Sequence, residues 1–183
     1  MDKSSKQRVI LIAVTIGILL SLNYAIYEKE ALKREGSTFY LKLVPVDPRS
    51  LMQGDYMRLR YAVENEAYKA TGEVRKRGFM VLSLDPSGVA SFDRFHMDSA
   101  LAENEVLVKY VHKRRRVEIK PDSFMFQEGN ARYYTPAVYG VFKAPPPDRP
   151  GRPLLVGLAG EDMKIIDPGD GLTVPGQVNT PGR

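Results

Sequence analysis

The chain has 183 residues, a formal net charge of +5 and no cysteine, which excludes a disulfide framework, a thiol nucleophile and a cysteine-based zinc site. Its length allows one modest domain with an appendage and excludes a large multidomain enzyme. Lysine and arginine total 27 against 22 aspartate and glutamate residues, with the signs interspersed, so the charge does not indicate a nucleic-acid-binding stripe.

An uncharged apolar stretch, residues 9–27, lies near the amino terminus. As a helix rising about 1.5 Å per residue it would cover roughly 28 Å, which matches the hydrocarbon core of a bilayer. Basic residues precede it, and Tyr24 and Tyr27 stand where interfacial aromatic side chains are expected. We therefore predict a transmembrane anchor over residues 9–27, with residues 1–8 in the cytoplasm.

A cleaved signal peptide is the alternative interpretation of this stretch. Cleavage requires small residues at the first and third positions before the cut. A cut after Ala25 places Asn23 at the third position, and a cut after Ala31 places Lys29 there, so an uncleaved anchor is favoured. Residues 28–36 then form a charged juxtamembrane linker, whose final glycine is expected to end the helix.

Beyond residue 36 apolar and polar residues alternate, which is typical of strands with one buried face. Residues 57–63 show this alternation, and so do residues 39–43. Turn-forming or proline-rich segments join three further strand pairs: 79–84 with 89–95, 106–111 with 117–119, and 138–143 with 154–158.

These patterns predict a mostly β fold, in which one amino-terminal transmembrane helix precedes a compact antiparallel β domain with one or two short helices. The β domain is expected over residues 37–167. Short helical or irregular excursions are expected at residues 65–73 and 129–137. Residues 168–183 are rich in glycine and proline and are expected to be disordered.

The densest group of special residues lies in the connection between the first two predicted strands. The dipeptides Asp47-Pro48 and Gly54-Asp55 favour turns at the two ends of this connection, and Gly54 can adopt a positive φ. Arg49 has the reach to pair with Asp47 or Asp55 in a bidentate contact. One interpretation is a well-made turn with an internal ion pair, and the other is a functional polar cluster.

Residues 54–61, Gly-Asp-Tyr-Met-Arg-Leu-Arg-Tyr, resemble the signature of the GDYxxLxY family of bacterial proteins. Residues 124–129 resemble the aromatic-x-Glu-Gly segment of that family, and residues 151–158 resemble its closing strand. The resemblance covers most of residues 41–158. It implies a membrane-associated protein of a family without an assigned biochemical activity, often encoded beside multi-spanning membrane proteins.

Strand parity divides the signature into two faces. Leu59 and Tyr61 should face the core, whereas Tyr56 should face the other way. If Asp55 approached Glu128, the repulsion between the two carboxylates could raise one pKa and create an acid–base pair. The candidate site residues are Asp47, Arg49, Gly54, Asp55, Tyr56, Leu59, Tyr61, Glu128 and Gly129.

An amino-terminal anchor before a β domain also resembles the signal peptidases. At the position of their nucleophilic serine this chain has Val46. Ser50 stands closer to the glycine, and no lysine can be assigned as its base, so proteolysis by a serine–lysine pair is not favoured.

The strongest charge run is the tip of the second predicted hairpin. It consists of His112, Lys113, Arg114, Arg115 and Arg116. A solvated hairpin tip is one interpretation, and contact with anionic lipid headgroups or an acidic partner is the other. No metal site or cofactor is expected, because the two histidines lack metal-ligand spacing and no nucleotide-binding or metalloprotease motif occurs.

Taken together, the sequence predicts a single-pass protein of the bacterial inner membrane with an extracytoplasmic carboxy-terminal domain. The expected partners are the lipid bilayer and an integral membrane protein, which the β domain would bind as an accessory subunit; nucleic acid is not expected. The lack of a recognisable catalytic set favours this function over an enzyme. The alternative is a membrane-anchored hydrolase that uses a carboxylate and tyrosine cluster around the Gly-Asp-Tyr turn.

Overall fold

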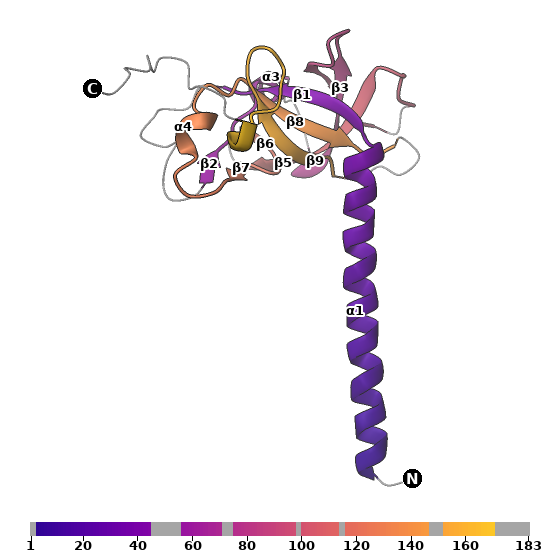
Figure 1. The fold of residues 1–183 in the computed structure, drawn as a ribbon. Helices are drawn as coiled ribbons and strands as arrows, with labels where there is room; N and C mark the ends of the chain where they lie inside the picture. The colour runs from indigo at the N-terminus through magenta and orange to yellow at the C-terminus, as the bar shows by residue number, and fades with distance from the viewer. Residues whose placement is uncertain are drawn as a thin grey trace, which may run out of the picture. The chain divides into compact units, whose positions relative to one another are not determined.

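The computed structural model describes residues 3–44, 56–70, 75–97, 100–113, 116–146 and 152–170. The chain divides into two compact units, Met1–Gly36 and Ser37–Arg183. One long helix makes up the described part of the first unit. Three antiparallel sheets, one of them only a strand pair, and short helices make up that of the second, so the predicted fold class is confirmed (Figure 1).

Helix α1 runs over Lys3–Glu35. Its apolar side chains are exposed along the helix, with Leu11 at 68% and Leu20 at 66%. In the described part of the chain it is the one helix that, over Ile10–Glu35, is long and apolar enough to span a membrane or to serve as a signal sequence.

Helix α1 ends at the predicted place. The Gly36 N–H donates a hydrogen bond to the Leu32 carbonyl at 2.9 Å, which satisfies one of the last carbonyls of the helix. Lys33 and Arg34 lie in the last turn, where positive charge interacts favourably with the helix dipole.

The first sheet of the β domain has the strand order β1-β8-β9, and all its pairs are antiparallel. Its strands are β1 (Ser37–Lys42), β8 (Tyr139–Ala144) and β9 (Leu154–Ala159). The predicted pairing across the proline-rich connection is confirmed, because Lys143 of β8 lies opposite Leu154 of β9.

The second sheet has the strand order β4-β3-β5-β6. Its strands are β3 (Arg77–Leu84), β4 (Ala90–Phe95), β5 (Glu105–Lys113) and β6 (Arg116–Ile119). Both predicted hairpins, β3 with β4 and β5 with β6, are confirmed. A further short pair joins β2 (Tyr56–Arg58) to β7 (Ser123–Met125).

Helix α3, Ala62–Lys69, joins the two outer strands of the four-stranded sheet. The Glu64 carboxylate accepts a hydrogen bond from the Ile119 N–H of β6 at 2.8 Å. The Glu66 carboxylate accepts one from the Phe92 N–H of β4 at 2.9 Å. Because β4 and β6 are the outermost strands, one short helix ties both sides of the sheet together.

The core contains buried side chains of the three-stranded sheet, the four-stranded sheet and α3. Phe39 of β1 stacks on Phe142 of β8 at 5.5 Å between ring centroids, and Tyr61 meets the same Phe142 ring edge-on at 5.6 Å. Met80 and Leu82 of β3 are fully buried with them. Burial of these apolar and aromatic side chains supplies the main stabilisation of the domain.

Two predicted boundaries are wrong. The strand expected over residues 57–63 ends at Arg58, and α3 begins at Ala62, earlier than the excursion expected at residues 65–73. The cause is helix capping, because the Glu64 side chain reaches back to the Tyr61 N–H (3.4 Å) and favours a helix start there.

At the carboxy-terminal end, the tail expected to be disordered begins with a short 3-10 helix, Pro168–Asp170, whose Gly169 N–H donates to the Asp167 carboxylate at 2.9 Å. Residues 171–183 lie outside the described part of the chain. The excursion expected at residues 129–137 contains helix α4, Ala131–Tyr134.

Candidate functional site

The structure describes part of the site predicted around the Gly-Asp-Tyr turn. The described candidates are Tyr56, Leu59, Tyr61, Glu128 and Gly129. Asp47, Arg49, Gly54 and Asp55 lie outside the described residues. The predicted cluster of these side chains therefore stays a prediction.

Strand parity within the signature is as predicted. Met57, Leu59 and Tyr61 are 7%, 4% and 0% exposed, whereas Tyr56 is 40% exposed. The pairing of β2 with β7 produces this separation, because it sets Met57 opposite Phe124 on the inward side. Leucine and the second tyrosine of the signature are therefore core residues.

Leu59 and Tyr61 hold the segment between β6 and β7 in place. The Leu59 N–H donates to the Asp122 carbonyl at 2.9 Å, and the Tyr61 hydroxyl donates to the Pro121 carbonyl at 2.7 Å. We call Leu59, Tyr61 and Glu64 the signature clasp. Leu59 and Tyr61 bind a segment about 60 residues further along the chain, so the signature fixes a tertiary contact.

The tyrosine of the clasp is a structural hydrogen-bond donor. Burial raises the pKa of Tyr61 well above its usual value, and the negative charges of Glu64 and Asp122 raise it further. The hydroxyl therefore stays protonated and can donate its hydrogen bond to the Pro121 carbonyl. The Tyr61 ring also packs closely against Gly140. A Cβ atom at that position would lie 3.3 Å from the Tyr61 Cε1 atom, so a side chain there would crowd the ring.

Glu64 completes the clasp and was missed in the sequence analysis. Its Oε1 atom accepts from the Ile119 N–H and its Oε2 atom from the Tyr61 N–H. Burial raises the pKa of the Glu64 carboxyl, although the two backbone hydrogen bonds oppose the shift. A glutamate three residues after the residue that precedes a helix is a known capping pattern, so the sequence could have indicated the bond to Tyr61. The bond to Ile119 of β6 joins distant segments, and no local pattern predicts it.

Tyr56 and the Glu128–Gly129 turn remain accessible. Tyr56 lies opposite Met125 in the β2–β7 pair, and Glu128 is exposed in the turn that follows β7. Gly129 has a φ of 85°, which favours glycine, and no atom lies within 4 Å of where its Cβ would be. The turn conformation therefore accounts for this glycine without a bound group.

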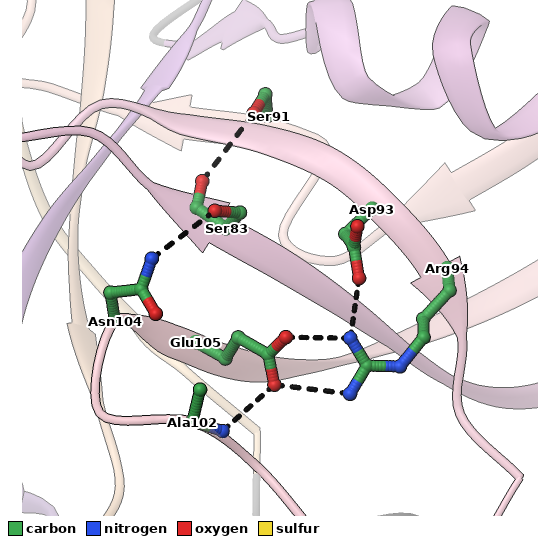
Figure 2. Close-up of polar contacts among 7 residues, drawn as sticks. All are labelled: Ser83, Ser91, Asp93, Arg94, Ala102, Asn104 and Glu105. Carbon is green, nitrogen blue, oxygen red and sulfur yellow. Dashed lines mark hydrogen bonds and ion pairs between the residues drawn. The ribbon is translucent and has the colours of Figure 1, made fainter.

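A charged cluster on the four-stranded sheet was also missed (Figure 2). The Arg94 guanidinium donates to both oxygens of Glu105, at 2.6 and 3.1 Å, and also pairs with Asp93. The Ala102 N–H donates to the same Glu105 carboxylate at 2.9 Å. The hydrogen bonds from Arg94 and Ala102 lower the pKa of Glu105 to about 2.

A β-bulge brings this cluster together. Phe92 lies opposite Leu82 and Arg94 lies opposite Val81, so Asp93 is an extra residue in β4. The extra residue resets the alternation and puts Arg94 on the same face as Glu105. The cluster therefore joins β4 to β5 across the central strand.

The basic hairpin tip is partly neutralised within the domain. Lys113 and Arg116 both pair with Glu118, at 2.9 and 2.7 Å. The hydrogen bond from Lys113, helped by the charge of Arg116, lowers the pKa of Glu118 despite its burial. His112 lies in β5 opposite Val117, and Arg114 and Arg115 lie outside the described residues.

No group of three or more His, Cys, Asp or Glu side chains that could hold a metal ion occurs among the described residues.

In comparisons with known proteins, residues 18–158 match the model of a family described as GDYXXLXY protein. The searches of curated proteins and of solved structures gave no match. The matched range begins within α1 and ends within β9, so it includes the signature clasp and the strands of the β domain up to Leu158.

Proposed function

The chain belongs to the GDYXXLXY family, and from this premise we propose that it is a membrane-anchored accessory subunit of an integral membrane protein in the bacterial inner membrane. In this proposal α1 crosses the bilayer once, the amino end is cytoplasmic and the β domain is extracytoplasmic. The observation that carries the proposal is the exposed, uncharged apolar surface of α1.

Small residues on α1 support a helical partner within the bilayer. Ala13, Gly17, Ser21 and Ala25 recur at every fourth position. Residues four apart lie on one helix face, and small side chains let a second helix approach closely in lipid. Nothing lies within 4 Å of where a Gly17 Cβ would be.

The described polar groups of the β domain support a binding function over hydrolysis. Tyr61 and Glu64 are committed to backbone groups, and Glu105 is committed to Arg94. A nucleophile or general base needs a free lone pair directed at a substrate. These three residues do not provide one.

Site-specific crosslinking of the full chain, expressed at its native level, tests the proposal. A photo-crosslinking amino acid at Ser21 should give an adduct with a membrane protein, and one at Leu19, on the other face of α1, should not. Gly17→Leu should abolish the adduct because the added side chain holds the helices apart.

Thr15→Leu is the control, since it places the same leucine side chain on the face of α1 away from the small residues. The Thr15 hydroxyl donates to the Leu11 carbonyl of its own helix at 2.9 Å, and the backbone hydrogen bonds of α1 do not depend on it, so its loss should leave α1 intact. A chain that alkaline carbonate extracts from the membrane would refute the anchor. A chain that stays in the membrane without any adduct would refute the partner.

A further inference from the structure

Two basic runs that lie far apart in the sequence meet at one end of the four-stranded sheet. Arg77 begins β3 and lies opposite Val111 near the end of β5, and the His112 N–H donates to the Lys76 carbonyl at 2.9 Å. Lys113 lies opposite Arg116, the first residue of β6. We call these exposed residues the basic end: Arg75, Lys76, Arg77, Lys113 and Arg116.

The basic end carries more positive charge than the domain neutralises. Glu118 pairs with both Lys113 and Arg116, but its single negative charge offsets only one of the five positive charges. Arg75, Lys76 and Arg77 form no ion pair with another described residue. A net charge of +4 therefore remains on this end, with His112 counted as neutral.

The side chains of the basic end favour binding to an anionic lipid surface over binding to a protein partner. Protein interfaces depend on buried apolar or aromatic anchors at their centre. Among the described residues of the β domain, the exposed large apolar side chains all lie outside β3, β5 and β6: Tyr56, Tyr68, Met97, Met125 and Ile165. Clustered lysine and arginine bind anionic headgroups through charge alone.

A bilayer is also the polyanion that the chain would keep within reach. The proposed function places α1 in a membrane, and tethering converts a second contact with that membrane into an intramolecular one at high effective concentration. Resting on that proposed function, we propose that the basic end binds the anionic phospholipid headgroups of the bilayer that α1 enters.

Lysine footprinting of the full chain in lipid nanodiscs tests this inference. Acetylation of Lys76 and Lys113 should fall when phosphatidylglycerol is added to phosphatidylcholine discs, and high salt should restore it because the contact is electrostatic. Lys42 of β1, which is exposed, is the internal reference and should not change.

Charge variants identify the residues responsible. Each lysine or arginine near a headgroup surface changes the association constant about fivefold, so Arg75→Gln with Arg77→Gln should weaken association about 30-fold and remove the protection. Arg75→Lys with Arg77→Lys keeps the charge and should retain it. Arg152→Gln with Lys164→Gln removes the same charge elsewhere on the domain and should also retain it.

The possible outcomes separate the inference from the proposed function. Unchanged acetylation of Lys76 and Lys113 in phosphatidylglycerol discs, or equal protection in pure phosphatidylcholine, would overturn the lipid contact while leaving the anchor intact. Protection found only in native membranes would assign the basic end to an acidic protein and overturn it too. Failure of the chain to enter discs of any composition would overturn the anchor and, with it, this inference.

Discussion

Glu64 of the signature clasp and Glu105 of the charged cluster both accept hydrogen bonds on both carboxylate oxygens, yet their pKa values move in opposite directions. Glu64 is half-buried with backbone N–H donors, and burial raises its pKa. Glu105 meets the Arg94 guanidinium on the outer face of a sheet, and its pKa falls to about 2.

The comparison shows that the number of hydrogen bonds does not decide the ionisation of a carboxyl group. What differs is whether a cation accompanies the donors and whether water is excluded. The clasp therefore stabilises the fold through packing and directed hydrogen bonds. The charged cluster joins two strands through an ion pair that solvent can reach.

Removal of the clasp tyrosine should have the largest effect. Tyr61→Ala takes a fully buried ring out of the core and should lower the free energy of unfolding by about 3–5 kcal/mol. Tyr61→Phe keeps the ring but leaves the Pro121 carbonyl without its donor, so it should cost about 1–2 kcal/mol. Urea unfolding in detergent, followed by tyrosine circular dichroism, measures both. Equal losses would show that the ring packing is unimportant.

Changes at Glu64 should come next. Glu64→Ala leaves the Ile119 and Tyr61 N–H groups without acceptors and should cost about 1–3 kcal/mol, whereas Glu64→Gln keeps an acceptor oxygen and should cost less. Because the folded pKa is raised, the stability contributed by this carboxyl is present at low pH and declines as pH rises above 4.5.

Urea unfolding of the wild type and Glu64→Gln over this pH range tests the sign. The wild type should lose stability relative to the variant as pH rises. A wild type that gains stability relative to Glu64→Gln would show that the backbone donors outweigh burial.

The smallest effect is expected at Glu105, because its partner Arg94 is partly exposed and solvent weakens the ion pair. Its folded pKa is lowered, so its contribution is present above pH 4.5 and is lost as pH falls toward about 2. Glu105→Gln should therefore lower the unfolding midpoint slightly at neutral pH and not at all in strong acid. Glu103→Gln removes a neighbouring exposed charge and is the control. A deficit that persists in strong acid would mean that the loss is not electrostatic.

Local patterns predicted much of the fold. The alternation at Leu59 and Tyr61 identified core positions, the Asp85-Pro86-Ser87-Gly88 turn identified a hairpin, and the apolar stretch before Gly36 identified α1. Each of these depends on residues that are neighbours in the sequence. Side-chain period and turn chemistry determine such features directly.

What the sequence did not reveal depends on pairing between distant segments. The ion pair of Arg94 with Glu105 needs a bulge that no local pattern specifies. The basic end needs Arg77 to lie opposite Val111, and sequence reasoning therefore found only the run at residues 112–116. Long-range register of this kind follows from the packing of the whole sheet.

The two glutamates of α3 also affect how copies of the chain meet one another. Open strand edges offer unpaired N–H groups to a strand from another molecule, and this is a common route to aggregation. Glu64 and Glu66 occupy one such group on each outer strand, at Ile119 and Phe92, and α3 lies against both strands. A strand from another molecule would have to displace α3 before it could pair with β4 or β6. This protection matters most for domains concentrated in a plane, where encounters between copies are frequent.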